Sequence, residues 1–325
     1  MKKKELEKSR KILLFILGLL AVSLITVLVD IGFKVSKSIN SEPSLVIPQI
    51  SLNAQPGVGL IKIEGPIEMS SGENFLGVLS GAESIVDQLD TLGKDPKIKA
   101  LVVRINSPGG TVAATQEIYE KIWKLRSKGL KIIASLGDVA ASGGYYIASA
   151  CNLIMANYGS VTGSIGVIAA SPNLKELFEK LGIKMNIIKS GKYKDILASH
   201  RDLSKGEKKL LQKMIDSTYK KFLKDVAQGR GLKVSKIKPY ADGRIMNGEM
   251  ALECKLVDLL GPLEEAFLKV KKLANLPEDA PVYESNDNPW EQIMMSIKGS
   301  LGKNFLSNYK FKYQSLYNLE YRYLP

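Results

Sequence analysis

Short apolar runs alternate with segments of helical periodicity along most of the chain. Each run holds four to six residues and predicts a buried strand: residues 58–63, 100–105, 131–136, 153–156 and 185–189. Apolar positions at helical spacing lie between or after these runs, at about residues 81–93, 112–128, 142–150, 173–181, 204–228 and 262–274. This alternation predicts an α/β fold whose strands are largely parallel.

A longer apolar run, residues 12–29, contains no charged residue. As a helix its 18 residues would span about 27 Å, close to the hydrocarbon thickness of a bilayer. No convincing cleavage site follows, so we expect an uncleaved transmembrane anchor over residues 12–31. Residues 1–11 carry six Lys or Arg and two Glu, and this basic segment should stay in the cytoplasm. The remainder would lie in the periplasm or outside the cell, attached to the inner or plasma membrane by a single pass.

Three further segments follow the expected anchor. Residues 32–56 are rich in Ser, Asn and Pro and predict a linker, and residues 57–284 predict a globular domain with one copy of its core unit. In the tail, residues 285–325, apolar side chains recur at near-helical spacing: Trp290, Ile293, Met294, Ile297, Leu301 and Phe305. That pattern fits a helix packed on the domain or on a neighbour, or an amphipathic helix docked on a membrane surface.

The composition narrows the classes of partner. The formal net charge is +13, spread thinly beyond the first segment, and the chain has no nucleic-acid motif. We therefore expect anionic surroundings such as lipid headgroups, and no nucleic acid. Cys151 and Cys254 lie far apart without a second Cys or His nearby, which argues against a metal knuckle and leaves two buried thiols or a disulfide. We expect neither a metal nor a cofactor.

The chain contains one histidine, His200, so a Ser–His–Asp triad would depend on it. His200 stands in the polar stretch 199–202, which is typical of a surface loop, and we interpret it as a solvated bystander. A nucleophilic serine would then need another base. Lysine can serve where burial or nearby dipoles lower its pKa, but composition does not select which lysine.

Two glycine-rich turns follow predicted strands. NSPGG at residues 106–110 leaves bare backbone N–H groups at the carboxyl end of a strand, where they form either a tight turn or an oxyanion hole. VAASGGYY at residues 139–146 places Ser142 at the start of a helix, as an N-cap or as a nucleophile whose small neighbours admit a substrate. The Gly143 N–H group could complete an oxyanion hole begun at Gly110.

Two later motifs carry hydroxyl groups and lysines. The run YGSVTGSIGV at residues 158–167 is either a Gly/Ser turn or a means of placing a hydroxyl beside a lysine amine. SGKYKD at residues 190–195 offers two lysines within six residues.

Five motifs in order, NSPGG, VAASGGYYIASA, GSVTGSIGV, SGKYKD and ADGRIMNGEMALECKLVDLLG, resemble those of the signal peptide peptidase A family of membrane-bound Ser–Lys proteases. The resemblance covers about residues 57–275 and implies a Clp/crotonase-like fold with repeated ββα units. Matched residue by residue, it implies that Ser142 is the nucleophile, Lys194 the general base and Ser164 the hydroxyl that orients the lysine.

The same resemblance assigns the oxyanion hole to the glycine pair, with Gly110 preferred over Gly109. It implies that residues 57–284 form a protease domain acting on remnant signal peptides and other short unfolded peptides. A single core copy matches the short forms of the family, which assemble as ring-like homo-oligomers with Ser and Lys from adjacent subunits. Two other functions stay open: a catalytically silent membrane scaffold, and a crotonase-type acyl-CoA enzyme that shares the fold.

Overall fold

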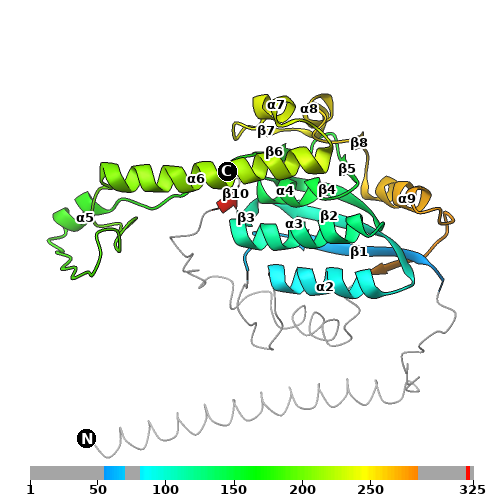
Figure 1. Cartoon of the computed structure of the whole chain (residues 1–325), viewed down its shortest axis with the longest axis horizontal. Helices are drawn as coiled ribbons and strands as arrows, with labels where there is room; N and C mark the ends of the chain where they lie inside the picture. The colour runs from blue at the N-terminus through cyan, green and yellow to red at the C-terminus, as the bar shows by residue number, and fades with distance from the viewer. Residues whose placement is uncertain (1–54, 70–80, 285–319, 323–325) are drawn as a thin grey trace, which may run out of the picture. The chain divides into compact units, whose positions relative to one another are not determined.

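The structure of the chain is a computed structural model that describes residues 55–69, 81–284 and 320–322 (Figure 1). All described residues belong to the second of two compact units, Gln55–Pro325. The expected anchor and nearly all of the linker and tail lie outside the described residues. Within the described part of the chain, no helix is both long and apolar enough to cross a membrane.

Three long parallel strands form the centre of the sheet: β1 (Gly57–Glu64), β2 (Ile98–Ser107) and β4 (Lys131–Ala141). Among the described residues the strand order is β7-β6-β4-β2-β1-β9, with β5 beside β4 and β8 beside β5. The outer strands are short: β5 (Leu153–Ala156), β6 (Val161–Gly163), β7 (Ile245–Met246), β8 (Leu259–Leu260) and β9 (Val282–Glu284). A separate two-stranded pair joins β3 (Gly109–Thr111) to β10 (Glu320–Arg322).

The predicted α/β class is confirmed, and the reason is visible in β2. Its residues Leu101, Val103 and Ile105 pack in one core with the helices α2 (Ala82–Lys94), α3 (Val112–Ser127) and α4 (Gly143–Ser149). The alternate residues Ala100 and Val102 pack in a second core against α9 (Leu263–Leu273). Because both faces of β2 are buried, most of its central residues are apolar, and this run is easily recognised in the sequence.

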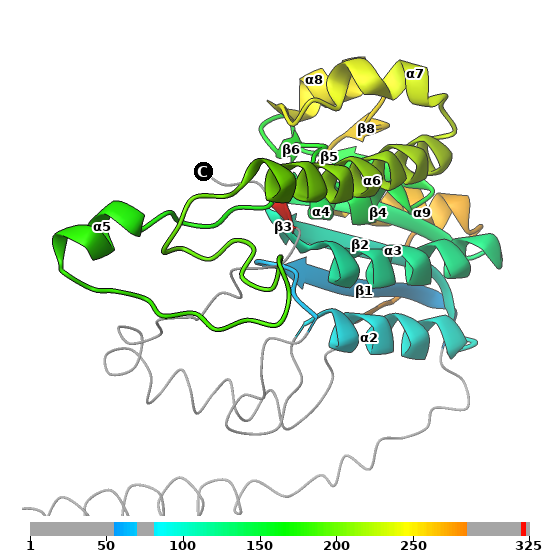
Figure 2. The same cartoon turned by 60° about the vertical axis from the view of Figure 1, so that its left-hand side comes forward.

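The remaining helices complete the described part of the domain. The longest, α6 (Lys205–Arg230), has 26 residues, and its carboxyl half packs into the first core through Phe222 and Val226. Of two short helices, α8 (Gly248–Glu253) contacts β6, β7 and β8, and α7 (Val234–Ile237) contacts α6; both lie at the top of Figure 2.

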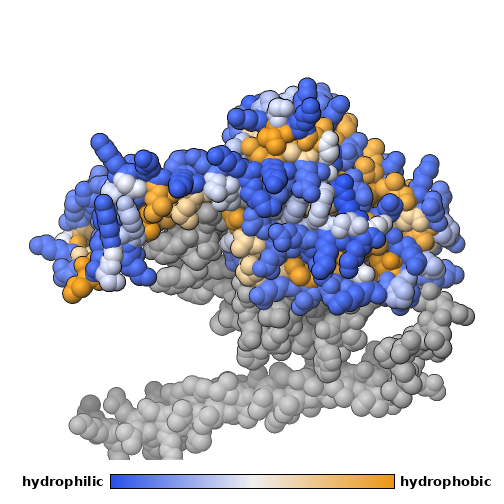
Figure 3. All heavy atoms as spheres, in the orientation of Figure 1, coloured by the Kyte–Doolittle hydropathy of each residue, from blue (hydrophilic) through white to orange (hydrophobic). Residues whose placement is uncertain are grey.

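The prediction of a strand at residues 185–189 is wrong. Residues 166–203, here called the arm, leave the sheet after β6, carry the helix α5 (Lys175–Lys180) and return at α6 (Figure 1). Every residue from 181 to 194 is exposed, and Ile188 is exposed completely. The apolar run therefore has no sheet to join among the described residues. In Figure 3, apolar patches interrupt the charged surface at the left, where Figure 1 places α5 and the neighbouring part of the arm.

Candidate active site

The turn after β2 is shaped by a glycine that no other residue can replace. A Cβ atom on Gly110 would lie 1.8 Å from the carbonyl oxygen of Ile67. Gly109, with φ of 98°, donates its N–H to the Oγ atom of Ser107 at 3.1 Å. The Gly109 N–H is thus bonded within its own turn.

The N–H and carbonyl groups of Gly110 face away from Ile67. Ile67 is instead bonded to the residues on either side of Gly110. Its N–H donates to the Gly109 carbonyl at 2.9 Å, and the Thr111 N–H donates to the Ile67 carbonyl at 2.8 Å. Neighbouring residues of a strand present their backbone groups to opposite edges. The second edge of β3 faces β10, whose Tyr321 is paired with Gly110 in antiparallel register. This edge therefore accepts an extended chain.

Ser142 stands at the sharp turn from β4 into α4. Its φ of 54° and ψ of −114° are unusual for a residue with a side chain, and such a conformation costs about 1–3 kcal/mol. Only 1% of its surface is exposed. Ser142 occupies the N-cap position, but among the described residues its side chain makes no cap hydrogen bond. The side-chain hydrogen bond that defines an ordinary N-cap residue is therefore not made by Ser142 in the described structure.

A backbone hydrogen bond joins Ser142 to Gly163, the residue before Ser164. The N–H of Ser142 donates to the carbonyl of Gly163 at 2.9 Å, and Ser164, with φ of 50°, donates its own N–H to the Arg244 carbonyl at 2.7 Å. Because β2, β4 and β6 are neighbours in the sheet, the turns at their carboxyl ends meet at one corner.

The start of α4 closes this corner. A Cβ atom on Gly144 would lie 2.8 Å from the carbonyl oxygen of Ser107, so the helix begins in close contact with the end of β2. The preceding Gly143 is the first residue of α4, and its N–H has no acceptor within the helix. The structure thus brings Gly109, Gly110, Ser142, Gly143 and Ser164 to neighbouring turns at one edge of the sheet.

Lys194 belongs to a different element. It lies in the arm, in consecutive turns over residues 191–198, with its N–H bonded to the Gly191 carbonyl at 3.1 Å. The residue is exposed. Across the described ranges, no hydrogen bond joins its side chain to Ser142 or Ser164.

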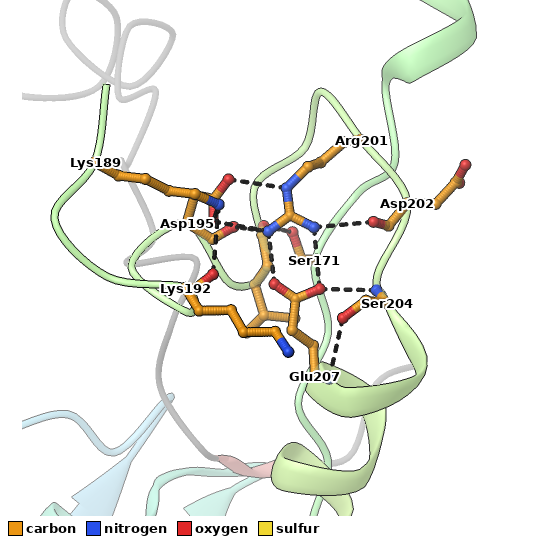
Figure 4. A network of polar contacts seen from close by, with 9 residues as sticks. Ser171, Lys189, Lys192, Asp195, Arg201, Asp202, Ser204 and Glu207 are labelled. Atoms are coloured by element: carbon orange, nitrogen blue, oxygen red, sulfur yellow. Dashed lines mark hydrogen bonds and ion pairs between the residues drawn. The ribbon is translucent and has the colours of Figure 1, made fainter. Parts of the chain in front are cut away.

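The structure shows an ion network next to Lys194 that the sequence analysis did not predict (Figure 4). Arg201 binds both Asp195 and Glu207, and its guanidinium lowers the pKa of Glu207 to about 2. The same guanidinium, followed by the Lys189 amine, lowers the pKa of Asp195. Both carboxylates lie six residues from Arg201, and residues 195–201 form neither a helix nor a strand, so no periodic sequence pattern indicates these contacts.

The histidine and the cysteines take no part in these contacts. His200 is half-buried and precedes Arg201 in the sequence, and among the described residues no hydrogen bond or ion pair joins its side chain to the network. Cys151 is buried, Cys254 is half-buried and both are free thiols. Burial raises the pKa of the Cys151 thiol to about 12. Among the described residues, no group of three or more His, Cys, Asp or Glu is placed to hold a metal ion.

Comparison with known proteins agrees with this architecture. Residues 79–155 match the family model of Clp protease, and residues 124–277 match that of peptidase family S49. A Synechocystis sp. protein provisionally named protease slr0021 is 47% identical over 65% of this chain and 76% of its own length. A protein of Enterococcus faecium provisionally named signal peptide peptidase SppA is 34% identical over 70% of this chain and 65% of its own. The chloroplastic serine protease SPPA of Arabidopsis thaliana is 36% identical, and the match covers 68% of this chain and 32% of the relative.

The fold and the Clp match define an α/β domain of the Clp protease type. Within that class the chain belongs to peptidase family S49, the signal peptide peptidase A family, as a short form. It is a serine peptidase.

Proposed function

We propose that this peptidase is a membrane-anchored Ser–Lys endopeptidase in which Ser142 is the nucleophile and Lys194 the general base. One observation carries the proposal: a buried serine with a strained backbone follows the central strand β4, between the Gly110 edge and Ser164. Strain of this kind persists where the surrounding structure enforces it, and it concentrates at reactive residues.

In the proposed reaction the neutral amine of Lys194 accepts the hydroxyl proton of Ser142 while Oγ attacks the carbonyl carbon of the scissile bond. The N–H groups of Gly110 and Gly143 stabilise the resulting oxyanion. The intermediate collapses, the C–N bond breaks and the lysine gives its proton to the departing amine. Water then attacks the acyl ester, with Lys194 accepting its proton and returning it to Ser142. Ser164 holds the amine in place by a hydrogen bond.

The substrate would bind as an extended strand along the edge of β3 that β10 covers in this structure, in place of β10. Support comes from β10, since that edge already pairs with an antiparallel segment through Gly109–Thr111. Backbone pairing of this kind gives affinity that depends little on side chains. We therefore propose short or unfolded peptides as substrates, among them remnant signal peptides, in keeping with the name of the Enterococcus faecium relative.

The lysine of each site would come from an adjacent subunit of a ring-like homo-oligomer. Two features support this arrangement: Lys194 lies on the arm and not at the serine corner, and the arm exposes apolar side chains that a neighbouring copy would cover. These are Leu177, Leu181, Ile183, Met185, Ile187 and Ile188. The proposed membrane anchor at residues 12–31 would hold the ring on the outer face of the membrane, where signal peptides are released.

The test is peptide hydrolysis by the full-length chain, together with labelling by a fluorophosphonate probe. Ser142→Ala should lower kcat at least 1000-fold, an order of magnitude set by losing a nucleophile, and should abolish labelling. Ser127→Ala removes an exposed hydroxyl on α3 and is the matched control, with full activity expected. Turnover retained by a folded Ser142→Ala protein would remove Ser142 from the mechanism and favour the scaffold or acyl-CoA alternatives.

A further inference from the structure

The ion network beside Lys194 spans two elements through one guanidinium. Arg201 donates from Nε to Oδ2 of Asp195 at 2.9 Å and from Nη2 to the main-chain carbonyl of Asp195 at 3.0 Å. It also donates from Nη1 and Nη2 to the two carboxylate oxygens of Glu207, at 3.0 and 2.6 Å. Arg201 thus binds both the side chain and the backbone of Asp195, the residue next to Lys194 (Figure 4).

Glu207 is the fixed end of this connection. It lies in the first turn of α6, is 2% exposed, and forms a capping box in which its side chain accepts from the Ser204 N–H and its own N–H donates to Ser204 Oγ. The helix is about 39 Å long, at 1.5 Å per residue, and its carboxyl half is packed in the core. Glu207 is therefore held by the rigid part of the domain.

Asp195 is the end that would otherwise be mobile. The backbone around it forms only successive turns, and Leu197 in the same stretch has φ of 64°, an unfavourable conformation for a bulky residue. Lys189 adds a second cation to the Asp195 carboxylate at 2.5 Å. Local backbone preference does not favour this turn. The ion pairs of Asp195 therefore help to fix it, together with the backbone hydrogen bonds and the bond from Ser171 Oγ to the Leu197 carbonyl.

We propose that Arg201 is a positioning residue of the peptidase reaction, which fixes the Lys194 turn to α6 by bridging Asp195 and Glu207. The inference rests on the proposed role of Lys194 as the base. Only a guanidinium has the planar set of donors that reaches two carboxylates and a carbonyl together, so lysine should replace Arg201 poorly.

The experiment measures kcat, KM and the pH profile of the full-length chain and its Arg201→Ala, Arg201→Lys, Asp195→Ala and Lys194→Ala variants. Misplacing a catalytic group by about 1 Å lowers the rate about 100-fold, so Arg201→Ala should lose about that factor in kcat with KM nearly unchanged. Arg201→Lys should recover little of the lost kcat. Asp195→Ala breaks the same connection while leaving the Arg201–Glu207 pair, and serves if Arg201→Ala does not fold.

Arg230→Ala is the matched control, because Arg230 also forms an Arg–Asp ion pair, with Asp258, away from both the arm and the serine corner. It should lower the unfolding temperature but keep kcat and the pH profile of the unaltered chain. Full kcat in folded Arg201→Ala and Asp195→Ala, beside an inactive Lys194→Ala, overturns the positioning role alone. An active Lys194→Ala overturns the proposed base and this inference with it.

Discussion

At the scale of single residues, two serines with positive φ define the candidate site. Ser142 and Ser164 both adopt the left-handed region, at 54° and 50°, and both follow strands that pair with each other. Their N–H groups are bonded to backbone carbonyls, which leaves the side-chain oxygens as the groups available for chemistry. Neither feature identifies the base, because Lys194 lies on the arm.

The choice of base is tested by comparing Lys194 with the one histidine. Lys194→Ala removes the amine and Lys194→Arg replaces it with a group that keeps its proton, so both should be inactive. His200→Ala, a matched control on the same arm, should keep most activity. Initial rates of the folded variants measure both effects, and a folded but inactive His200→Ala would transfer the role of base to His200.

At the scale of elements, the site depends on how closely the turns after β2 and β4 approach other backbone. Gly110 lies against Ile67 and Gly144 against Ser107, at distances that leave no room for a methyl group. The two glycines therefore do more than permit a turn: they set the separation between the β3 edge and the start of α4.

Gly110→Ala should displace β3 and its N–H donor. Overpacking of this kind destabilises by about 1–3 kcal/mol, and peptidase activity should fall further than the loss of folded protein explains. Gly159→Ala is the control, because a Cβ atom there meets nothing within 4 Å. Thermal unfolding and kcat, measured side by side, separate the two effects. Equal activity of the two alanine variants would contradict a role for the Gly110 turn in catalysis.

The sequence predicts these elements unevenly, for physical reasons. β1, β2, β4 and β5 were predictable because buried strands are continuous apolar runs, and α6 because its periodicity extends over many turns. Residues 185–189 have the same local composition but lie on the arm, where none of the described strands pairs with them. The contacts of the β3–β10 pair and of the Arg201 network do not lie within one continuous helix or strand, so no periodicity indicates them.

At the scale of the whole molecule, the proposed mechanism includes assembly, because Lys194 lies on the arm and Ser142 at the end of β4. Each copy presents Ser142 at the sheet and Lys194 on an arm with exposed apolar side chains. Burial of about 100 Å² of apolar surface stabilises an interface by about 2.5 kcal/mol, so a covered arm would contribute strongly to a ring. The proposed account therefore requires two copies for one complete site.

Mixing two inactive variants tests this central claim most directly. Ser142→Ala and Lys194→Ala chains, each inactive alone, are co-expressed with different tags, and oligomers carrying both tags are isolated and assayed for peptide hydrolysis. The account predicts measurable recovered activity, because some interfaces pair an intact Ser142 of one copy with an intact Lys194 of the next. Complete inactivity of verified mixed oligomers would contradict a dyad shared between subunits.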